Sequence, residues 1–165
     1  MSKKAYSKKK ELTPGKILIL VAIAALVIYF GTTFPKSIVA YTPDDILTYS
    51  IKYISDISTG ETDGYKTGSY AATDLAAVAL SEALDARMYR RQLFGIGNNT
   101  VDAEGMVEVL LVSSDGDWFT LRCYSDGTVM IQSPGEEDFK AYRSGWGFGR
   151  NGQQLFRELL QVFAD

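Results

Sequence analysis

The residues best suited to acid–base chemistry are two groups of carboxylates in the second half of the chain. Asp115 and Asp117 flank a glycine, and Glu136–Asp138 is a run of three acids. Two carboxylates on opposite sides of a cleft can hydrolyse a substrate by general acid–base catalysis. Both groups also lie in sequences typical of tight turns, where acidic side chains are solvated, and we favour that interpretation. A carboxylate-dependent hydrolase is kept as an alternative function.

Nucleophilic and metal chemistry is restricted by the composition, because the chain has no histidine and a single cysteine, Cys123. This excludes Ser-His-Asp and Cys-His catalysis, histidine metal ligands, paired-cysteine zinc sites and any intrachain disulfide. Cys123 alternates with polar residues in an apolar run, which predicts a buried and unreactive thiol. No cofactor and no metal are expected.

A glycine-rich stretch near the C-terminus, residues 147–152, formally matches the dinucleotide pattern G-x-G-x-x-G. The pattern requires a following parallel strand and an acid roughly 20 residues further on, whereas this sequence ends 13 residues later at Asp165, so a dinucleotide site is not expected. A connector that covers the core is the preferred interpretation of this stretch. The alternative is a contact with a partner or an anion, for which the candidates are Trp146, Phe148, Gly149 and Arg150.

Three arginines, Arg87, Arg90 and Arg91, fall near the C-terminal end of a predicted helix. There they would complement the negative end of the helix dipole. The alternative is a contact with anionic lipid headgroups or an acidic envelope polymer.

Charge and hydropathy divide the chain into a basic start, an apolar segment and an acidic remainder. Residues 1–16 hold six lysines against one glutamate, whereas the rest holds 11 basic against 19 acidic residues. Between them, residues 17–34 are almost entirely apolar and would span about 27 Å as a helix, close to the roughly 30 Å of a bilayer core. The acidic remainder makes nucleic-acid binding an unfavourable hypothesis.

Three interpretations fit this apolar segment: an uncleaved signal anchor, a cleaved signal peptide and a buried core helix. The anchor is preferred, because six lysines precede the segment, small residues suited to cleavage do not follow it, and it has no polar face. The positive-inside rule then places the N-terminus in the cytoplasm. The residues predicted to flank the membrane are Lys8, Lys9, Lys10, Lys16, Tyr29 and Phe34.

Helical signals dominate the region that follows. Thr42-Pro43-Asp44-Asp45 resembles a helix start, and apolar residues at helical spacing predict an amphipathic helix over residues 43–57. After a polar loop, a second helix is predicted from about Ala71 to Leu93. Its expected buried stripe is Leu75, Val78, Ala79, Ala83 and Met88.

The hydropathy period then changes from 3.6 to 2. Strands are predicted at residues 106–112, 118–124 and 128–132, with a possible fourth at 139–143, and Asp-Gly turns separate the first three. A C-terminal helix is predicted over residues 153–163, capped by Asn151.

These elements predict an α+β chain: an N-terminal transmembrane helix, then a small domain of two helices, a three- or four-stranded antiparallel meander and a C-terminal helix. The predicted organisation is a basic cytoplasmic tail at 1–16, a transmembrane signal anchor at 17–34, a linker at 35–42 and an extracytoplasmic domain at 43–165.

The function expected from this organisation is a single-pass, membrane-anchored, non-catalytic binding or assembly module of a cell-envelope complex. Its expected partners are the lipid bilayer and other envelope proteins, and no residue pattern identifies a small-molecule ligand. Besides the hydrolase, a regulatory subunit that acts through its transmembrane helix is an alternative.

Overall fold

A computed structural model describes residues 13–57, 66–92, 103–144 and 151–162. It divides into two compact units, with the boundary between Thr32 and Thr33. The predicted tail residues Lys8, Lys9 and Lys10 lie outside the described residues, as do Trp146, Phe148, Gly149 and Arg150.

Among the described residues, the N-terminal unit consists of one apolar helix, α1 (Pro14–Thr33), whose last residue belongs to the second unit. Its 18-residue window Pro14–Gly31 has a mean hydropathy of 2.1, and none of it is buried. The helix ends two residues before Pro35, which cannot continue it. This length and composition are consistent with a signal anchor or with a signal peptide.

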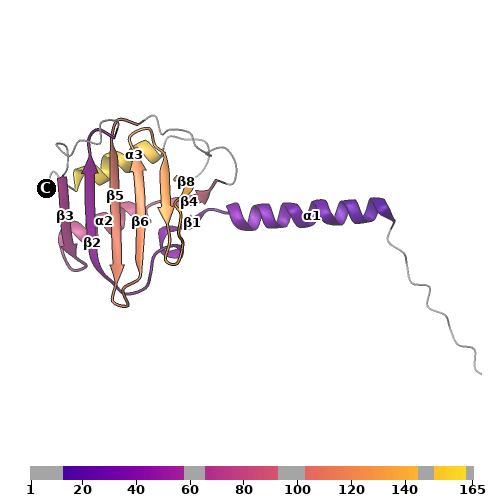
Figure 1. The fold of residues 1–165 in the computed structure, drawn as a ribbon, viewed down its shortest axis with the longest axis horizontal. Helices are drawn as coiled ribbons and strands as arrows, with labels where there is room; N and C mark the ends of the chain where they lie inside the picture. The colour runs from indigo at the N-terminus through magenta and orange to yellow at the C-terminus, as the bar shows by residue number, and fades with distance from the viewer. Residues whose placement is uncertain (1–12, 58–65, 93–102, 145–150, 163–165) are drawn as a thin grey trace, which may run out of the picture. The chain divides into compact units, whose positions relative to one another are not determined.

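The second unit is built on one eight-stranded antiparallel sheet in the order β1-β4-β8-β7-β6-β5-β2-β3 (Figure 1). It is therefore much larger than the three- or four-stranded meander predicted from the sequence. The strands are β1 (Lys36–Ser37), β2 (Ile46–Ile54), β3 (Lys66–Ala71), β4 (Met88–Arg91), β5 (Met106–Ser113), β6 (Trp118–Tyr124), β7 (Val129–Gln132) and β8 (Lys140–Ser144).

Two helices, α2 (Leu75–Asp85) and α3 (Asn151–Gln161), lie behind this sheet in Figure 1 and cover one of its faces. The core lies between the sheet and these two helices, because alternate strand residues point towards the helices. Fully or almost fully buried side chains there include Ile51, Leu80, Leu84, Val107, Val109, Leu111, Phe119, Leu121, Ile131, Leu155 and Leu159. Ile38 of a short 3₁₀ helix, η1 (Ile38–Ala40), joins this core, so the predicted linker at 35–42 contributes to the domain.

The helix predicted over residues 43–57 is wrong, since most of that segment forms strand β2. Tyr49 and Ile51 are buried while Ser50 between them is only half-buried, which is a two-residue period. β-Branched and aromatic residues make up most of the strand and fit a pleated surface. The supposed capping sequence is instead a turn, in which Asp45 has a φ of 50°.

The second predicted helix is also wrong at both ends. Residues 66–71 form β3, the helix runs only from Leu75 to Asp85, and Met88–Arg91 forms β4. The face predicted to be buried is exposed: 88% of Leu75 and 43% of Val78 remain accessible. The buried helix residues are Ala77, Leu80 and Leu84.

The second half of the chain matches its prediction closely. Strands β5 to β8 fall within a residue or so of the four predicted segments. The three turns that join these four strands contain Gly116, Gly127 and Gly135, all with positive φ, as the Asp-Gly and Pro-Gly sequences require. Helix α3 is confirmed with Leu155 and Leu159 fully buried, although it already includes Asn151 as its first residue.

Candidate interaction surface

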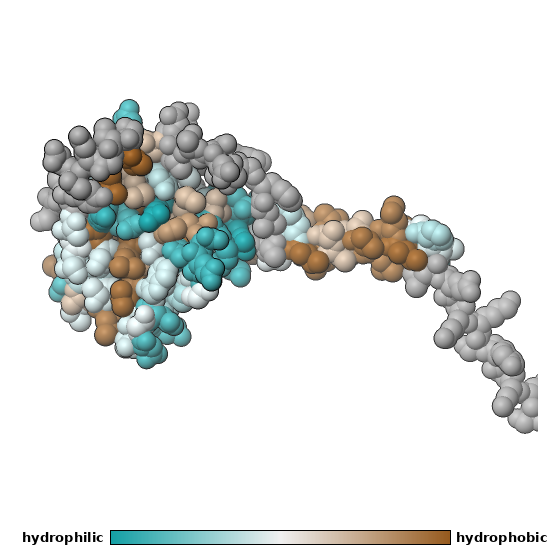
Figure 2. All heavy atoms as spheres, viewed as in Figure 1, coloured by the Kyte–Doolittle hydropathy of each residue, from teal (hydrophilic) through white to brown (hydrophobic). Residues whose placement is uncertain are grey.

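The face of the sheet opposite α2 and α3 carries no described helix, and we call it the uncovered face. Its residues are those between the core positions, so the strand register arranges them in rows across the sheet. One row joins Thr48, Val112 and Trp118, and the next joins Ser50, Leu110 and Thr120, of which Thr120 is buried. Figure 2 looks onto this face and shows apolar side chains along β5 between more polar flanks.

A charged row crosses the uncovered face. Lys52, Glu108 and Arg122 stand opposite one another on β2, β5 and β6. The Arg122 Nε donates to Glu108 Oε2 at 2.7 Å, and its guanidinium lies 4.0 Å from the centre of the Phe139 ring. These contacts fix the guanidinium between a carboxylate and an aromatic ring, so the row is a preorganised polar surface.

An aromatic side chain and hydroxyl groups lie at the other end of this face. Trp118 is 39% exposed, which is unusual for so large an apolar side chain. Ser50 Oγ and Ser69 Oγ lie 3.4 Å apart on neighbouring strands. Exposed tryptophan beside hydroxyl and apolar groups is typical of surfaces that bind proteins.

Two arginines occupy paired positions on the uncovered face, one on β4 and one on β8. Arg90 and Arg143 are opposite each other in the register, and both are exposed. None of the ion pairs found among the described residues includes either of them. Like charges directly opposite destabilise a sheet, so an acidic group from a partner would relieve this repulsion.

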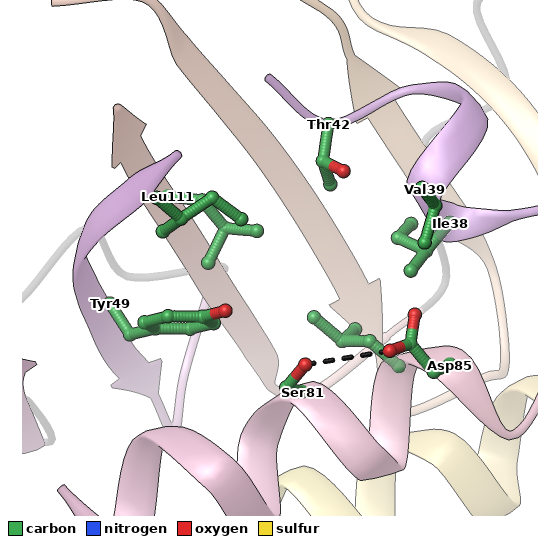
Figure 3. Close-up of a pocket in the computed structure, with 9 residues that line it drawn as sticks. Ile38, Val39, Thr42, Tyr49, Ser81, Asp85 and Leu111 are labelled. Carbon is green, nitrogen blue, oxygen red and sulfur yellow. Dashed lines mark hydrogen bonds between the residues drawn. The ribbon is translucent and has the colours of Figure 1, made fainter. Parts of the chain in front are cut away.

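A small hollow lies on the helix side of the sheet, between η1, the start of β2 and α2 (Figure 3). Its volume is about 60 Å³, far below the roughly 300–1,000 Å³ of sites that bind small molecules. Ser81 and Asp85 stand at its edge, 3.5 Å apart. The hollow can take a few waters or the tip of one side chain. It is lined by Ile38, Val39, Thr42, Ile46, Tyr49, Ser81, Leu84, Asp85 and Leu111.

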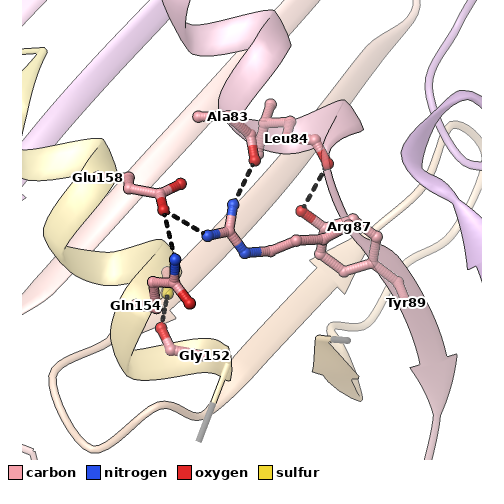
Figure 4. Close-up of polar contacts among 8 residues, drawn as sticks. Ala83, Leu84, Arg87, Tyr89, Gly152, Gln154 and Glu158 are labelled. Atoms are coloured by element: carbon pink, nitrogen blue, oxygen red, sulfur yellow. Dashed lines mark hydrogen bonds and ion pairs between the residues drawn. The ribbon is translucent and has the colours of Figure 1, made fainter. Parts of the chain in front are cut away.

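The three arginines predicted near the end of one helix have separate positions. Arg90 and Arg91 lie in β4, whereas Arg87 is buried beyond the end of α2 (Figure 4). Arg87 donates to the Ala83 carbonyl at 2.8 Å and pairs with Glu158 of α3 at 2.7 Å. Its hydrogen bond and charge lower the pKa of the Glu158 carboxyl. Arg87 therefore joins the two helices and is not available to lipid or polymer.

Cys123 is fully buried, as predicted. Its thiol donates to the Gly152 carbonyl at 3.4 Å, and burial raises its pKa to about 12. A thiol in this environment is a poor nucleophile.

The candidate carboxylates are on turns. Asp115 and Asp117 are exposed between β5 and β6, and Glu137 and Asp138 are exposed between β7 and β8. Glu136 forms an ion pair with Lys140. None of them lines the hollow described above, and the described residues contain no group of three or more acids or cysteines able to hold a metal.

The predicted membrane-flanking residues that can be located are Lys16, in the first turn of α1, Tyr29, near its end, and Phe34, just beyond it. Tyr29 makes an edge-to-face contact with Phe30, and Phe34 is 60% exposed.

The uncovered face was missed by sequence reasoning, because its rows exist only once eight strands have paired. Comparison with protein-family models, with curated proteins and with solved structures finds no match to this chain.

Proposed function

We propose that the chain is a single-pass membrane protein with a cytoplasmic N-terminus and an extracytoplasmic domain, which acts as a non-catalytic binding or assembly module of a cell-envelope complex. The main support is the uncovered face, where Trp118 and the Arg90–Arg143 pair are exposed on a rigid sheet. A partner with an apolar contact and an acidic group suits this surface. The helix α1, with its hydropathy and the lysines before it, supports the membrane location.

The location is tested by cysteine labelling of the full chain in intact cells. The exposed turn residue Asp115 is changed to cysteine in one variant, and Ser2 in another, while buried Cys123 gives little background. A membrane-impermeant maleimide should label Asp115→Cys before lysis and Ser2→Cys only after lysis. Labelling of Asp115→Cys only after lysis would contradict the extracytoplasmic location.

The binding role is tested by photocrosslinking in the same cells. A photoreactive amino acid replaces Trp118 on the uncovered face or, as the matched control, exposed Arg157 on α3. The proposal expects a discrete crosslinked product from position 118 only, which weakens when Arg90 and Arg143 are both changed to glutamate. Equal products from both positions, or none from position 118, would contradict a specific role for this face.

A further inference from the structure

Strand β3 ends the sheet and pairs with β2 alone. The Ala72 N–H donates to the Leu47 carbonyl at 3.1 Å, which fixes the alternation of the antiparallel ladder. By this alternation Gly68 and Tyr70 turn their backbone groups towards β2. Thr67 and Ser69 turn theirs outward, away from the sheet.

The free part of this edge is short. Ala71 is also directed outward, but its N–H donates to Asp74 Oδ2 at 2.8 Å and its carbonyl accepts the Asp74 N–H at 2.9 Å. Among the described residues, no backbone hydrogen bond satisfies the outward groups of Thr67 and Ser69. Two donors and two acceptors are thus left on a strand edge, the usual template for pairing with another strand.

An exposed apolar patch adjoins this edge, and we call it the apolar corner; it consists of Leu47, Ala72, Leu75 and Val78. Leu75 is 88% exposed and Leu47 58% exposed, although both are large aliphatic side chains. They are neighbours of β3, since Ala72 directly follows it and bonds to Leu47. Exposed aliphatic side chains on neighbouring elements are typical of interaction sites.

The free edge is complementary to itself. In an antiparallel pair with Gly68 opposite Gly68 of a second copy, each Thr67 faces a Ser69, and four backbone hydrogen bonds form. The Ser50–Ser69 hydroxyl pair then continues to Thr67 of the second copy.

We propose that β3 is the edge at which two copies of this chain associate, through an antiparallel β3–β3 pair about a two-fold axis. Four backbone bonds form a small interface beside the roughly 800 Å² per partner of a standard complex. In this register the two apolar corners lie at opposite ends of the paired strands, roughly 27 Å apart, so they do not contact each other. Confinement of both copies to one membrane would raise their effective concentration.

The register is tested with two differently tagged full-length chains, one carrying Thr67→Cys and the other Ser69→Cys, in membranes under mild oxidation. When co-expressed, they should give a disulfide-linked heterodimer, because paired residues lie about 5.5 Å apart. Either variant alone should give almost none, since like-numbered residues are two positions out of register, about 8 Å apart and beyond disulfide reach. Failure of the mixture to crosslink, or equal crosslinking of either single variant, would overturn the proposal.

The pairing itself is tested with Ser69→Pro, with Ser69→Ala as the matched control. Proline removes an outward N–H that β2 does not use, so the sheet should keep its far-UV circular dichroism. Sedimentation of the full chain in detergent should show an association constant at least about tenfold lower for Ser69→Pro, because symmetry removes the bond twice. An unchanged constant would show that another surface, such as α1, drives association.

Discussion

Replacement of Arg87 is expected to destabilise the domain more than loss of its ion-pair partner. The helix α2 ends at Asp85, and three groups satisfy its last carbonyls in succession. The Ala86 N–H bonds to Glu82, the Arg87 guanidinium to Ala83, and the Tyr89 hydroxyl to Leu84 at 3.1 Å. Arg87→Met keeps most of the aliphatic stem but leaves the part-buried Ala83 carbonyl without its donor.

The expected cost follows from these contacts. A hydrogen bond from a charged donor is worth about 1.5–3 kcal/mol, and the Arg87 side chain is only 9% exposed. The Glu158 side chain is 33% exposed, so the ion pair should add only about 0–1 kcal/mol. We therefore expect Arg87→Met to lower the free energy of unfolding by about 2–3 kcal/mol and Glu158→Gln by less than about 1 kcal/mol.

The measurement is urea unfolding of the full chain in detergent, followed by the near-UV circular dichroism of the buried tyrosines. Because Arg87 lowers the pKa of Glu158 in the folded protein, the ion pair stabilises the fold above the ordinary value of 4.5. That contribution is lost as the pH falls below 4.5 through the lowered pKa, so wild type and Glu158→Gln should converge there.

Two results would refute this reasoning. If Glu158→Gln costs as much as Arg87→Met, the ion pair and not the carbonyl bond holds the helix end. If Arg87→Met changes stability by less than about 0.5 kcal/mol, the contact between α2 and α3 does not depend on this side chain.

Two further predictions concern the other buried contacts of α3. Gly152→Ala should destabilise the domain by about 1–3 kcal/mol in the same unfolding assay, because its new Cβ would overlap the Gly127 carbonyl, whereas exposed Arg157→Ala should cost less than about 0.5 kcal/mol. Stability equal to wild type would show that the two segments can separate. The Cys123 thiol, with its pKa raised to about 12, should resist iodoacetamide in the folded protein between pH 7 and 9 and react after unfolding in urea. Reaction of the native thiol at the rate of a free cysteine would show that α3 opens readily.

The strands from β5 to β8 could be predicted because their information is local. Each alternates apolar and polar residues, and Gly116, Gly127 and Gly135 mark the turns between them. The helix α3 has equally local signals, since Leu155 and Leu159 recur at helical spacing and are both fully buried. Neighbouring strands joined by tight turns need no knowledge of distant residues.

The region from Ile46 to Arg91 could not be predicted in this way because its structure depends on distant pairings. Strand β2 pairs with β5, some 60 residues further along the chain, and β4 pairs with β8. The isoleucines of β2 fit a helical period by chance, and only the pairing with β5 selects the period of two. The end of α2 likewise depends on Arg87 reaching Glu158, a contact that no local rule describes.

The candidate surface was harder to predict than the fold for the same reason. The candidates predicted from the sequence were carboxylates, Cys123 and a glycine-rich stretch. Each of these can be recognised from its own residues, without knowledge of distant parts of the chain. The uncovered face is distinctive only as a set, because Arg90 and Arg143 are 53 residues apart and become neighbours through β4 and β8. A like-charge pair across strands is invisible before the register is known.

The failed prediction for α2 shows where the folded domain leaves apolar surface exposed. Sequence periodicity assigned Leu75 and Val78 to the core, yet Ala77, Leu80 and Leu84 fill that role. The helix thus carries more apolar surface than one folded copy can bury, and the excess lies beside the free edge of β3. Burial of Leu75 would remove most of its exposed apolar surface from water, at roughly 25 cal/mol per Å². Leu75 and Val78, which periodicity assigned to the core, are therefore the exposed apolar residues that indicate a contact with another molecule.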